Sequence, residues 1–247
     1  MKEKEIYESM EEARKKYVEN MIANPIDLDS EFTFHCTKCG ECCKDREDIL
    51  LNPFDVYRIA KGLDVETYEV LDRYTYGYIG KSSRMPIVAV KMVEDSGCCV
   101  FLKGKKCGIQ DFKPGVCALY PLGRFVARDM EGDSSVSPKV SYILQPYNCG
   151  IRKDIHTPRQ WLKDFHMDEC EDEFILWQDI VFELSPRLAK IYDRLPHKVL
   201  DLFYDNLFGF LYINYDLEKE AAAQLESNWG YIQDMLRTVE DFLQEIG

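Results

Sequence analysis

A short stretch near the N-terminus constrains this chain most, because it places four cysteines within eight residues. They are Cys36, Cys39, Cys42 and Cys43. A thiolate is a preferred ligand of soft and borderline metals, and thiols two residues apart can reach one ion from a single turn. Gly40 follows the second cysteine, where a turn around a metal often needs a positive φ angle. The spacing therefore predicts a metal site, with buried structural thiols or part of a disulfide framework as the alternatives.

The composition fits an intracellular metal protein better than a secreted protein held by disulfides. The chain has 247 residues and ten cysteines, so it is long enough to bury a core without cross-links. Its first residues, Met1 to Glu5, are charged and lack the apolar run of a signal peptide. The longest apolar-looking stretch, residues 207–215, is too short to span a membrane. We therefore expect a cytoplasmic protein that has no membrane partner and uses its cysteines for metal binding.

The formal net charge of −13 is unevenly distributed along the chain. Residues 155–247 contain 19 acidic and 8 basic residues, so most of the net charge lies there. This balance argues against nucleic-acid binding and leaves an acidic surface for a basic protein partner.

Basic residues gather instead beside the cysteines. Four thiolates on Zn²⁺ or on an oxidised four-iron cluster leave a charge of about −2, which nearby cations would offset. Ordinary solvated side chains explain these residues equally well. They are Lys38, Lys44, Arg46, Lys103, Lys105, Lys106 and Lys113.

Helical patterns in the first half of the chain are short. Residues 3–23 predict one charged helix with a thin apolar stripe. Asn52 is expected to cap a helix that starts at Pro53 and is ended by Gly62, and Asp64 to cap the next helix. The tyrosine-rich run that follows is expected to be irregular over residues 74–78.

Strand patterns surround the cysteines. Residues 32–35 alternate and lead into the cluster as a short strand. Residues 86–93 predict a second strand, with a return strand over 98–102. A hairpin is expected between Arg124 and Leu144, and a short helix around Cys117. The cysteines are thus expected on short strands and the loops between them.

The pattern becomes helical after Gly150. Helices are expected from Thr157, over 171–184, 186–194 and 197–204, and over 227–246. Large apolar residues at helical spacing predict a packed core. These are Trp161, Phe165, Leu176, Trp177, Phe182, Leu188, Leu202, Phe203, Phe208 and Leu211. Cys170 has no cysteine neighbour here, which favours a buried apolar thiol.

Together these patterns predict an α+β protein. We expect a small irregular metal-centred domain with short antiparallel strands and flanking helices, followed by an all-helical C-terminal subdomain. The predicted ranges are 1–30 for an N-terminal charged helix, 31–155 for the cysteine-cluster domain and 156–247 for the acidic helical subdomain. No repeat or low-complexity linker separates the halves, so both are expected to pack together.

The downstream cysteines complete an ordered set of motifs. Phe34-x-Cys36-x-x-Cys39-Gly40-x-Cys42-Cys43 is followed by Cys99-x-Phe101-Leu102, Cys107-x-Ile109, Pro114-x-x-Cys117-x-x-Tyr120-Pro121 and Cys149. In this order the motifs resemble the YkgJ-type cysteine-cluster family, a zinc- or iron-chelating domain, over roughly residues 34–150. The chain departs from that family at Lys113 and at Ala118, where arginine is usual.

The resemblance implies metal binding but no single agreed reaction. One relative, the flagellin lysine methylase, carries a similar cluster that is associated with an iron–sulfur centre, so a methylase-like enzyme is one interpretation. This sequence lacks a glycine-rich turn after a strand for a cofactor, and it lacks the CxxxCxxC pattern of radical S-adenosylmethionine enzymes. Its four histidines form no recognisable pair with a reactive cysteine. The sequence therefore assigns metal binding without assigning catalysis.

Two hypotheses of function stay open. The first is an iron–sulfur or metal-cluster protein with a redox, modifying or sensing role, since CxxCxxC resembles the ferredoxin pattern. The second is a zinc-stabilised interaction module without catalysis, since CxxCG resembles a zinc knuckle. Eight thiols exceed the need of one structural zinc, which favours an iron–sulfur cluster such as 4Fe–4S, with Zn²⁺ or iron ions as alternatives.

Eight of the ten cysteines are expected to be metal ligands. They are Cys36, Cys39, Cys42, Cys43, Cys99, Cys107, Cys117 and Cys149. Neighbouring side chains of an extended chain diverge, so Cys42 and Cys43 are expected to serve different metals, or only one of them to bind. The same rule separates Cys98 from Cys99, and Cys99 is the expected ligand because it keeps the family spacing to Phe101.

Overall fold

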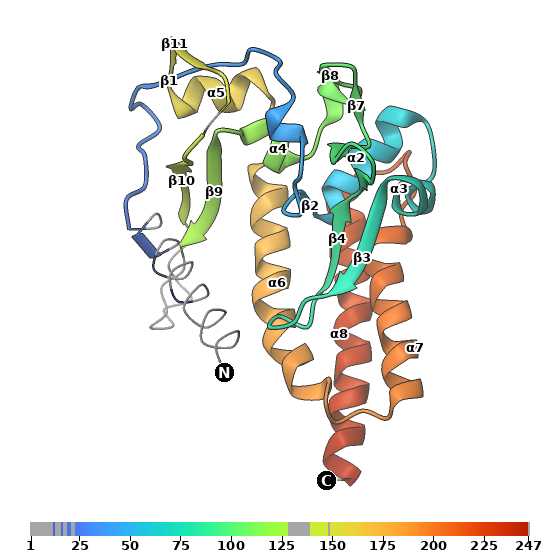
Figure 1. The fold of residues 1–247 in the computed structure, drawn as a ribbon. Coiled ribbons are helices and arrows are strands. Elements are labelled where there is room, and N and C mark those ends of the chain that lie inside the picture. Colours follow the sequence, from blue (N-terminus) through green and yellow to red (C-terminus); the bar gives the residue numbers. More distant parts are fainter. Residues whose placement is uncertain are drawn as a thin grey trace, which may run out of the picture. The chain divides into compact units, whose positions relative to one another are not determined.

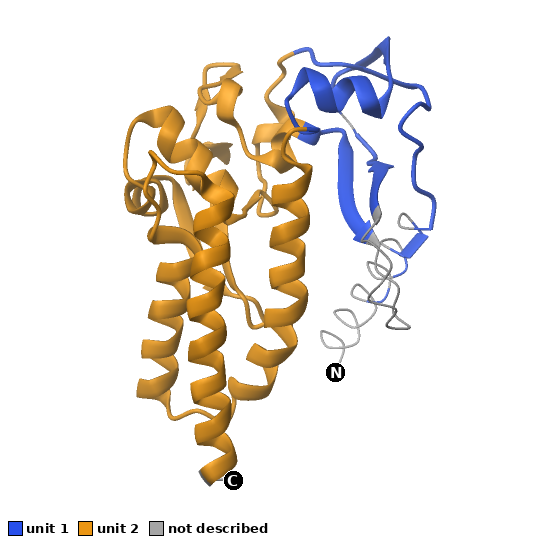
Figure 2. Cartoon of the chain, turned by 180° about the vertical axis from the view of Figure 1, so that it is seen from behind, with its two compact units in different colours: residues 1–37, 119–168 blue, residues 38–118, 169–247 orange. Residues whose placement is uncertain are grey.

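The structure is a computed structural model of the chain. It describes residues 23–127, 139–147 and 149–246, together with Glu12, Lys16, Glu19 and Asn20. The chain divides into two compact units, which Figure 2 colours separately. Unit 1 comprises residues 1–37 and 119–168, and unit 2 comprises residues 38–118 and 169–247. Each unit therefore joins segments that are distant in the sequence.

Unit 1 contains two antiparallel strand pairs. Strand β1 (Phe32–His35) pairs with β11 (Ile151–His156), with an irregular register near its end. Strand β9 (Leu122–Ala127) pairs with β10 (Lys139–Leu144) without a register shift. Both pairs are labelled in Figure 1. The β1–β11 pair brings the residues that precede Cys36 next to those that follow Cys149.

An aromatic cluster forms the interior of unit 1. Helix α5 (Pro158–Asp164) supplies Trp161, whose ring lies 5.7 Å from the Phe32 ring and 5.8 Å from the Phe34 ring, measured between centroids. The indole N–H of Trp161 donates a hydrogen bond of 3.1 Å to the Leu119 carbonyl. Buried tryptophan normally needs such a partner, so this bond fixes the ring in place.

The sheet of unit 2 has three strands in the order β2–β4–β3. They are β2 (Leu50–Leu51), β4 (Pro86–Val90) and β3 (Thr75–Ile79), and both pairings are antiparallel. Helices α2 (Pro53–Leu63) and α3 (Thr67–Tyr74) connect β2 to β3. The central strand β4 is almost wholly buried, as expected of a strand paired on both edges.

Six cysteines of unit 2 lie in a region built of very short elements. These elements are η1 (Glu41–Cys43), β5 (Met92–Val93) paired with β6 (Cys98–Cys99), β7 (Leu102–Lys103) paired with β8 (Lys106–Cys107), η2 (Gln110–Phe112) and α4 (Gly115–Leu119). The chain passes from unit 2 to unit 1 within α4. Two-residue strands are too short to be stable alone, so their position depends on what lies beneath them.

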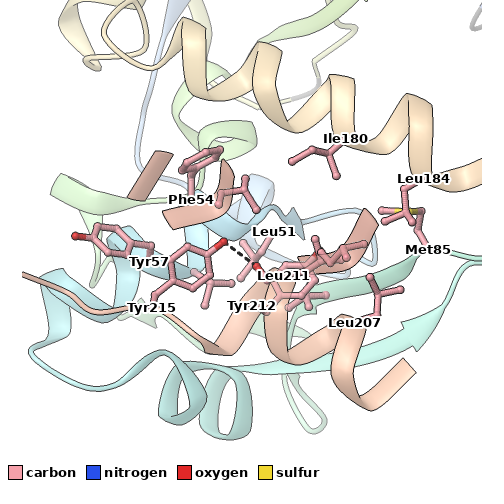
Figure 3. Packing of buried hydrophobic residues seen from close by; sticks show 14 of the residues in the cluster. Leu51, Phe54, Tyr57, Met85, Ile180, Leu184, Leu207, Leu211, Tyr212 and Tyr215 are labelled. Atoms are coloured by element: carbon pink, nitrogen blue, oxygen red, sulfur yellow. Dashed lines mark hydrogen bonds between the residues drawn. The ribbon is translucent and has the colours of Figure 1, made fainter. Parts of the chain in front are cut away.

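Long helices complete unit 2 and share its core. They are α6 (Glu171–Ile191), α7 (His197–Phe208), the π-helical segment η3 (Gly209–Ile213) and α8 (Ala221–Ile246). Phe54 and Ile59 of α2 are buried in the same hydrophobic cluster as Leu184 of α6 and Leu211 of η3. Figure 3 shows side chains of α2, α6 and η3 in this core. Each fully buried side chain of this kind contributes about 1.5–3 kcal/mol.

The sequence explains why α2 starts where it does. The Asn52 side chain accepts a hydrogen bond from the Asp55 amide, and the Asp55 carboxylate accepts one from the Asn52 amide. This reciprocal capping satisfies two amides that have no partner inside the helix. The helix continues through Gly62 and ends at Leu63, where Asp64 adopts left-handed backbone angles. A Cβ at Gly62 would lie 2.4 Å from the Phe112 ring, which explains a glycine inside a helix.

The α+β fold class is confirmed, with short antiparallel strands followed by a helical C-terminal region. Several local predictions are wrong. Residues 75–79 form strand β3, because pairing with β4 overrides the irregular tyrosine pattern. Glu66, and not Asp64, caps α3 together with Glu69. Pro186 lies inside α6, which runs unbroken from Glu171 to Ile191.

The helical core is only partly as predicted. Leu188, Phe203 and Leu211 are buried in unit 2. Phe182 and Leu202 are 54% and 63% exposed, because they lie on outer faces of their helices, so their assignment to the core is wrong. The early and late segments share one core in unit 2, as expected. The consecutive domain ranges 1–30, 31–155 and 156–247 remain a prediction, since compactness alone does not test independent folding.

Some predictions fall outside the described residues. They include most of the helix over 3–23 and the turn between β9 and β10. Among the helices that the structure describes, none is long and apolar enough to cross a membrane.

Candidate metal centre

Five thiols interact within unit 2. They come from η1 (Cys42 and Cys43), β6 (Cys99), β8 (Cys107) and α4 (Cys117). The charges of Cys99, Cys107 and Cys117 all act on the pKa of Cys43, so these four groups lie within electrostatic reach of one another. Thiols separated by as many as 75 positions therefore contribute to one cluster.

The turn at Gly40 brings Cys42 and Cys43 together. Gly40 has φ 80° and ψ 0°, a left-handed conformation that glycine adopts easily, and its carbonyl accepts the Cys43 amide at 2.9 Å. The segment Glu41–Cys43 is therefore a 3-10 turn, and the two sulfurs lie 3.8 Å apart. The expectation that these neighbours diverge as in an extended chain is wrong, because the backbone is not extended here.

The two thiols of this pair differ in pKa. The hydrogen bond between the two sulfurs raises the pKa of Cys42 and lowers the pKa of Cys43. Burial raises both pKa values, and Arg46 acts weakly in the opposite direction on Cys42. Of the two thiols, Cys43 therefore has the lower pKa and loses its proton first.

Cys99 and Cys98 lie in different surroundings although they are adjacent in β6. Burial raises the pKa of Cys99, while the amides of Phe101 and Leu102 donate to its sulfur and work against that rise. Backbone N–H groups aimed at a sulfur stabilise its thiolate form. The Cys98 sulfur instead donates to the Ser96 carbonyl at 3.5 Å. Cys99 packs partly against the hydrophobic core.

Cys117 is held by the start of α4. Its amide donates to the Pro114 carbonyl at 2.9 Å. Burial and then the charge of Cys99 raise the pKa of Cys117 to about 12, and Lys113 opposes this rise. Cys107 lies opposite Leu102 in the β7–β8 pair and also packs partly against the core. Cys107 and Cys117 thus each pack against the hydrophobic core and also lie near other thiols.

The other three expected ligands are placed differently. Cys39 is exposed at the start of unit 2, and Cys36 is exposed at the end of β1 in unit 1. Cys149 is buried in unit 1, where its sulfur lies 3.3 Å from the Tyr120 hydroxyl. The structure therefore brings five of the eight expected ligands together in one unit.

The thiols suit a metal chemically but are not arranged as a finished coordination shell. Among the residues that the structure describes, no three His, Cys, Asp or Glu side chains are disposed to hold an ion. Two thiolates on one tetrahedral zinc lie about 3.8 Å apart, since each Zn–S bond is about 2.3 Å. The Cys42–Cys43 distance of 3.8 Å equals that value. The donor set thus fits thiolate ligation, and the assignment of individual ligands remains a prediction.

Sequence patterns did not reveal the surroundings of Cys170. Its sulfur accepts a hydrogen bond of 3.4 Å from the Arg58 guanidinium, so the expectation of an apolar site for this thiol is wrong. Arg58 also binds the Glu173 carboxylate at 2.6 Å. The only hint in the sequence is the acidic run at the start of the helix over 171–191.

Comparison with known families agrees with the motif order. Residues 35–140 match the CxxCxxCC family, described as "Putative zinc- or iron-chelating domain". That range contains seven of the eight expected ligands and leaves out Cys149. The resemblance to a metal-chelating cysteine-cluster family is confirmed, and metal binding in general is supported.

One similar protein is the uncharacterized protein MJ0661 of Methanocaldococcus jannaschii. It is 37% identical to this chain over 93 residues, which are 36% of this chain and 44% of MJ0661. The chain therefore spans less than half of that relative. No solved structure matches the chain.

Proposed function

We propose that the thiols of unit 2 bind metal as thiolates and that the bound group is an iron–sulfur cluster with a redox or sensing role. The gathering of five thiols from four separate elements carries this proposal. One tetrahedral ion takes four thiolates, so the set exceeds what a single structural zinc needs. A bound cluster would supply one-electron redox chemistry.

Residues around the thiols would stabilise the thiolates and the bound group. The Phe101 and Leu102 amides would stabilise the Cys99 thiolate, and hydrogen bonds of this kind set cluster potentials. Lys113 would offset part of the negative charge beside Cys117. The apolar core beneath the thiols would limit access of water from that side. Binding requires the thiols to lose their protons, so metal affinity should rise with pH.

A single ion is the second candidate. The 3.8 Å separation of the Cys42 and Cys43 sulfurs favours two thiolates on one tetrahedral Zn²⁺ or iron ion. In that case the metal would stabilise the short loops, and the acidic helices of residues 169–247 would offer a surface to a basic protein partner. This form of the protein would be an interaction module without catalysis.

Anaerobic purification from an iron-replete host distinguishes the candidates. We expect iron together with acid-labile sulfide and a brown protein with broad visible absorption. Stoichiometric zinc without sulfide would reject the cluster and support the single ion. A chain that holds neither metal after reconstitution with iron and sulfide, or with zinc, would reject metal binding by this unit.

A further inference from the structure

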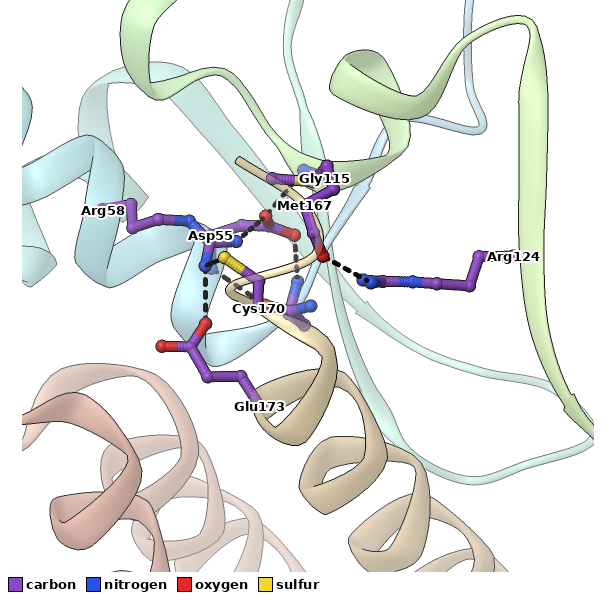
Figure 4. Close-up of polar contacts among 8 residues, drawn as sticks. Asp55, Arg58, Gly115, Arg124, Met167, Cys170 and Glu173 are labelled. Atoms are coloured by element: carbon purple, nitrogen blue, oxygen red, sulfur yellow. Dashed lines mark hydrogen bonds and ion pairs between the residues drawn. The ribbon is translucent and has the colours of Figure 1, made fainter. Parts of the chain in front are cut away.

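A buried carboxylate in α2 reaches the element that carries Cys117. Asp55 is 3% exposed, and its Oδ1 accepts the Gly115 amide at 2.8 Å. Its Oδ2 accepts the Asn52 amide at 3.1 Å as part of the α2 cap. Figure 4 shows the Asp55 carboxylate with Gly115 and Arg58. One side chain therefore links the start of α2 to the start of α4.

The Gly115 amide is an important point of attachment for Cys117. Gly115 is the first residue of α4, where an amide has no acceptor inside the helix. Cys117 follows two residues later, and its own amide is bonded to the Pro114 carbonyl. Because α4 is a single turn, holding its first amide fixes the direction in which the Cys117 side chain leaves the backbone.

Arg58 holds Asp55 in this orientation. Its Nη2 donates to Asp55 Oδ1 at 2.9 Å, and its Nη1 donates to Glu173 of α6 at 2.6 Å and to the Cys170 sulfur at 3.4 Å. Burial opposes the charge of the guanidinium, but Asp55, Cys170 and Glu173 together raise the pKa of Arg58. The carboxylate is thus fixed from both α2 and α6.

We propose that Asp55 is a positioning residue for the metal site, acting on Cys117 through the Gly115 amide. The proposal rests on the proposed function, because it assumes that Cys117 is a ligand. A residue that only caps α2 would change stability and leave metal affinity unchanged. A positioning residue must change the affinity and the number of thiolates bound.

Titration of the reduced, metal-free full chain with Co²⁺ separates these roles, since the sulfur-to-cobalt absorption grows with the number of bound thiolates. Asp55→Leu removes the acceptor for Gly115, and Asp55→Asn retains a carbonyl oxygen in its place. We expect Asp55→Leu to weaken Co²⁺ binding by about 10- to 100-fold, as for other residues that orient ligands. We also expect it to lower the absorption by about one thiolate of the four that a tetrahedral site takes. Asp55→Asn should stay within about threefold of wild type.

A matched control lies in the same unit. Glu240 of α8 pairs with Arg187 of α6 through two bonds of 2.9 and 2.8 Å, in a pair that includes none of the thiols. Glu240→Gln should lower stability without changing Co²⁺ affinity or spectrum. Circular dichroism would establish that each metal-free variant is folded.

The outcomes are distinguishable. Wild-type affinity and spectrum in folded Asp55→Leu would overturn the positioning role. The positioning role would also be overturned if Asp55→Asn lost as much Co²⁺ affinity as Cys117→Ser. If Asp55→Leu does not fold, the result for Asp55→Asn decides. A wild-type chain that binds no Co²⁺ through thiolates would reject the metal site itself.

Discussion

Units 1 and 2 hold their cysteines in different ways. In unit 2, Cys99 and Cys107 lie on two-residue strands that pack partly against a large aliphatic core. In unit 1, Cys149 lies beside Tyr120 and Cys36 is exposed at the end of β1, and the interior is an aromatic cluster around Trp161. Unit 2 therefore fixes several thiols with one core, whereas unit 1 fixes one thiol with local contacts.

This difference shows what the C-terminal helices contribute. Short strands and single helical turns have little stability of their own. In unit 2 they are stabilised because α6, η3 and α8 complete the core that α2 and the sheet begin. A thiol site built from short elements thus depends on helices that are more than 50 residues away in the sequence.

Truncation after Gly150 should have the largest effect. The shortened chain lacks α6, α7 and α8, and with them the buried side chains of Ile180, Leu184, Leu207, Leu211 and Leu225. We expect it to be insoluble or unfolded, with or without metal. Solubility, circular dichroism and metal content would check this. A soluble shortened chain with wild-type metal content would contradict the shared core.

Leu184→Ala should strongly destabilise unit 2. The side chain is 0% exposed in α6, and removing it leaves a cavity that costs about 2–5 kcal/mol in the free energy of unfolding. Leu202→Ala on α7 is the matched control, because Leu202 is 63% exposed and should change that free energy by about 0.5 kcal/mol or less. Urea unfolding measures both. Equal effects would contradict the burial of Leu184 in the core of unit 2.

Gly150→Ala should destabilise unit 1. Gly150 has φ +74°, and a Cβ there would lie 2.7 Å from the His35 carbonyl oxygen. The substitution combines left-handed strain with a clash, so we expect a loss of about 2–4 kcal/mol. Gly104→Ala has similar strain, with φ +63°, but no atom within 4 Å of its Cβ, so it should cost about 1–2 kcal/mol. Thermal unfolding would show the difference, and its absence would argue against the β1–β11 packing.

Cys170→Ser should have the smallest effect. It weakens the contact between the Cys170 sulfur and Arg58 but leaves the Asp55 and Glu173 bonds of Arg58 in place. We expect a change of about 0.5–1 kcal/mol in unfolding free energy and no change in metal content. Loss of metal as large as that in Cys117→Ser would show that Cys170 belongs to the site.

Local chemistry explains which features the sequence could predict. The Asn52–Pro53 start of α2 depends on a side chain and backbone three residues apart, so the sequence contains all that is needed. The spacing of Cys39 and Cys42 around Gly40 likewise predicted a turn. Fold class and family followed from the order of such local signals.

Features that depend on distant segments could not be predicted in this way. Strand β11 pairs with β1 across more than 100 positions, and no pattern near His35 indicates that partner. Arg58 and Asp55 look like an ordinary helical surface pair, although contacts with Glu173 and Gly115 place Asp55 in the interior. Pro186 is tolerated inside α6, although proline normally breaks a helix pattern.

Metal content of variants at two adjacent cysteines is the decisive test of metal binding by the thiols of unit 2. Cys99 receives backbone donors and packs against the core, whereas the Cys98 sulfur is bonded to the Ser96 carbonyl. We predict that Cys99→Ser loses most of the bound metal and that Cys98→Ser retains the wild-type amount, both measured per folded chain after anaerobic purification. Equal metal content in the two variants, or a loss confined to Cys98→Ser, would contradict it.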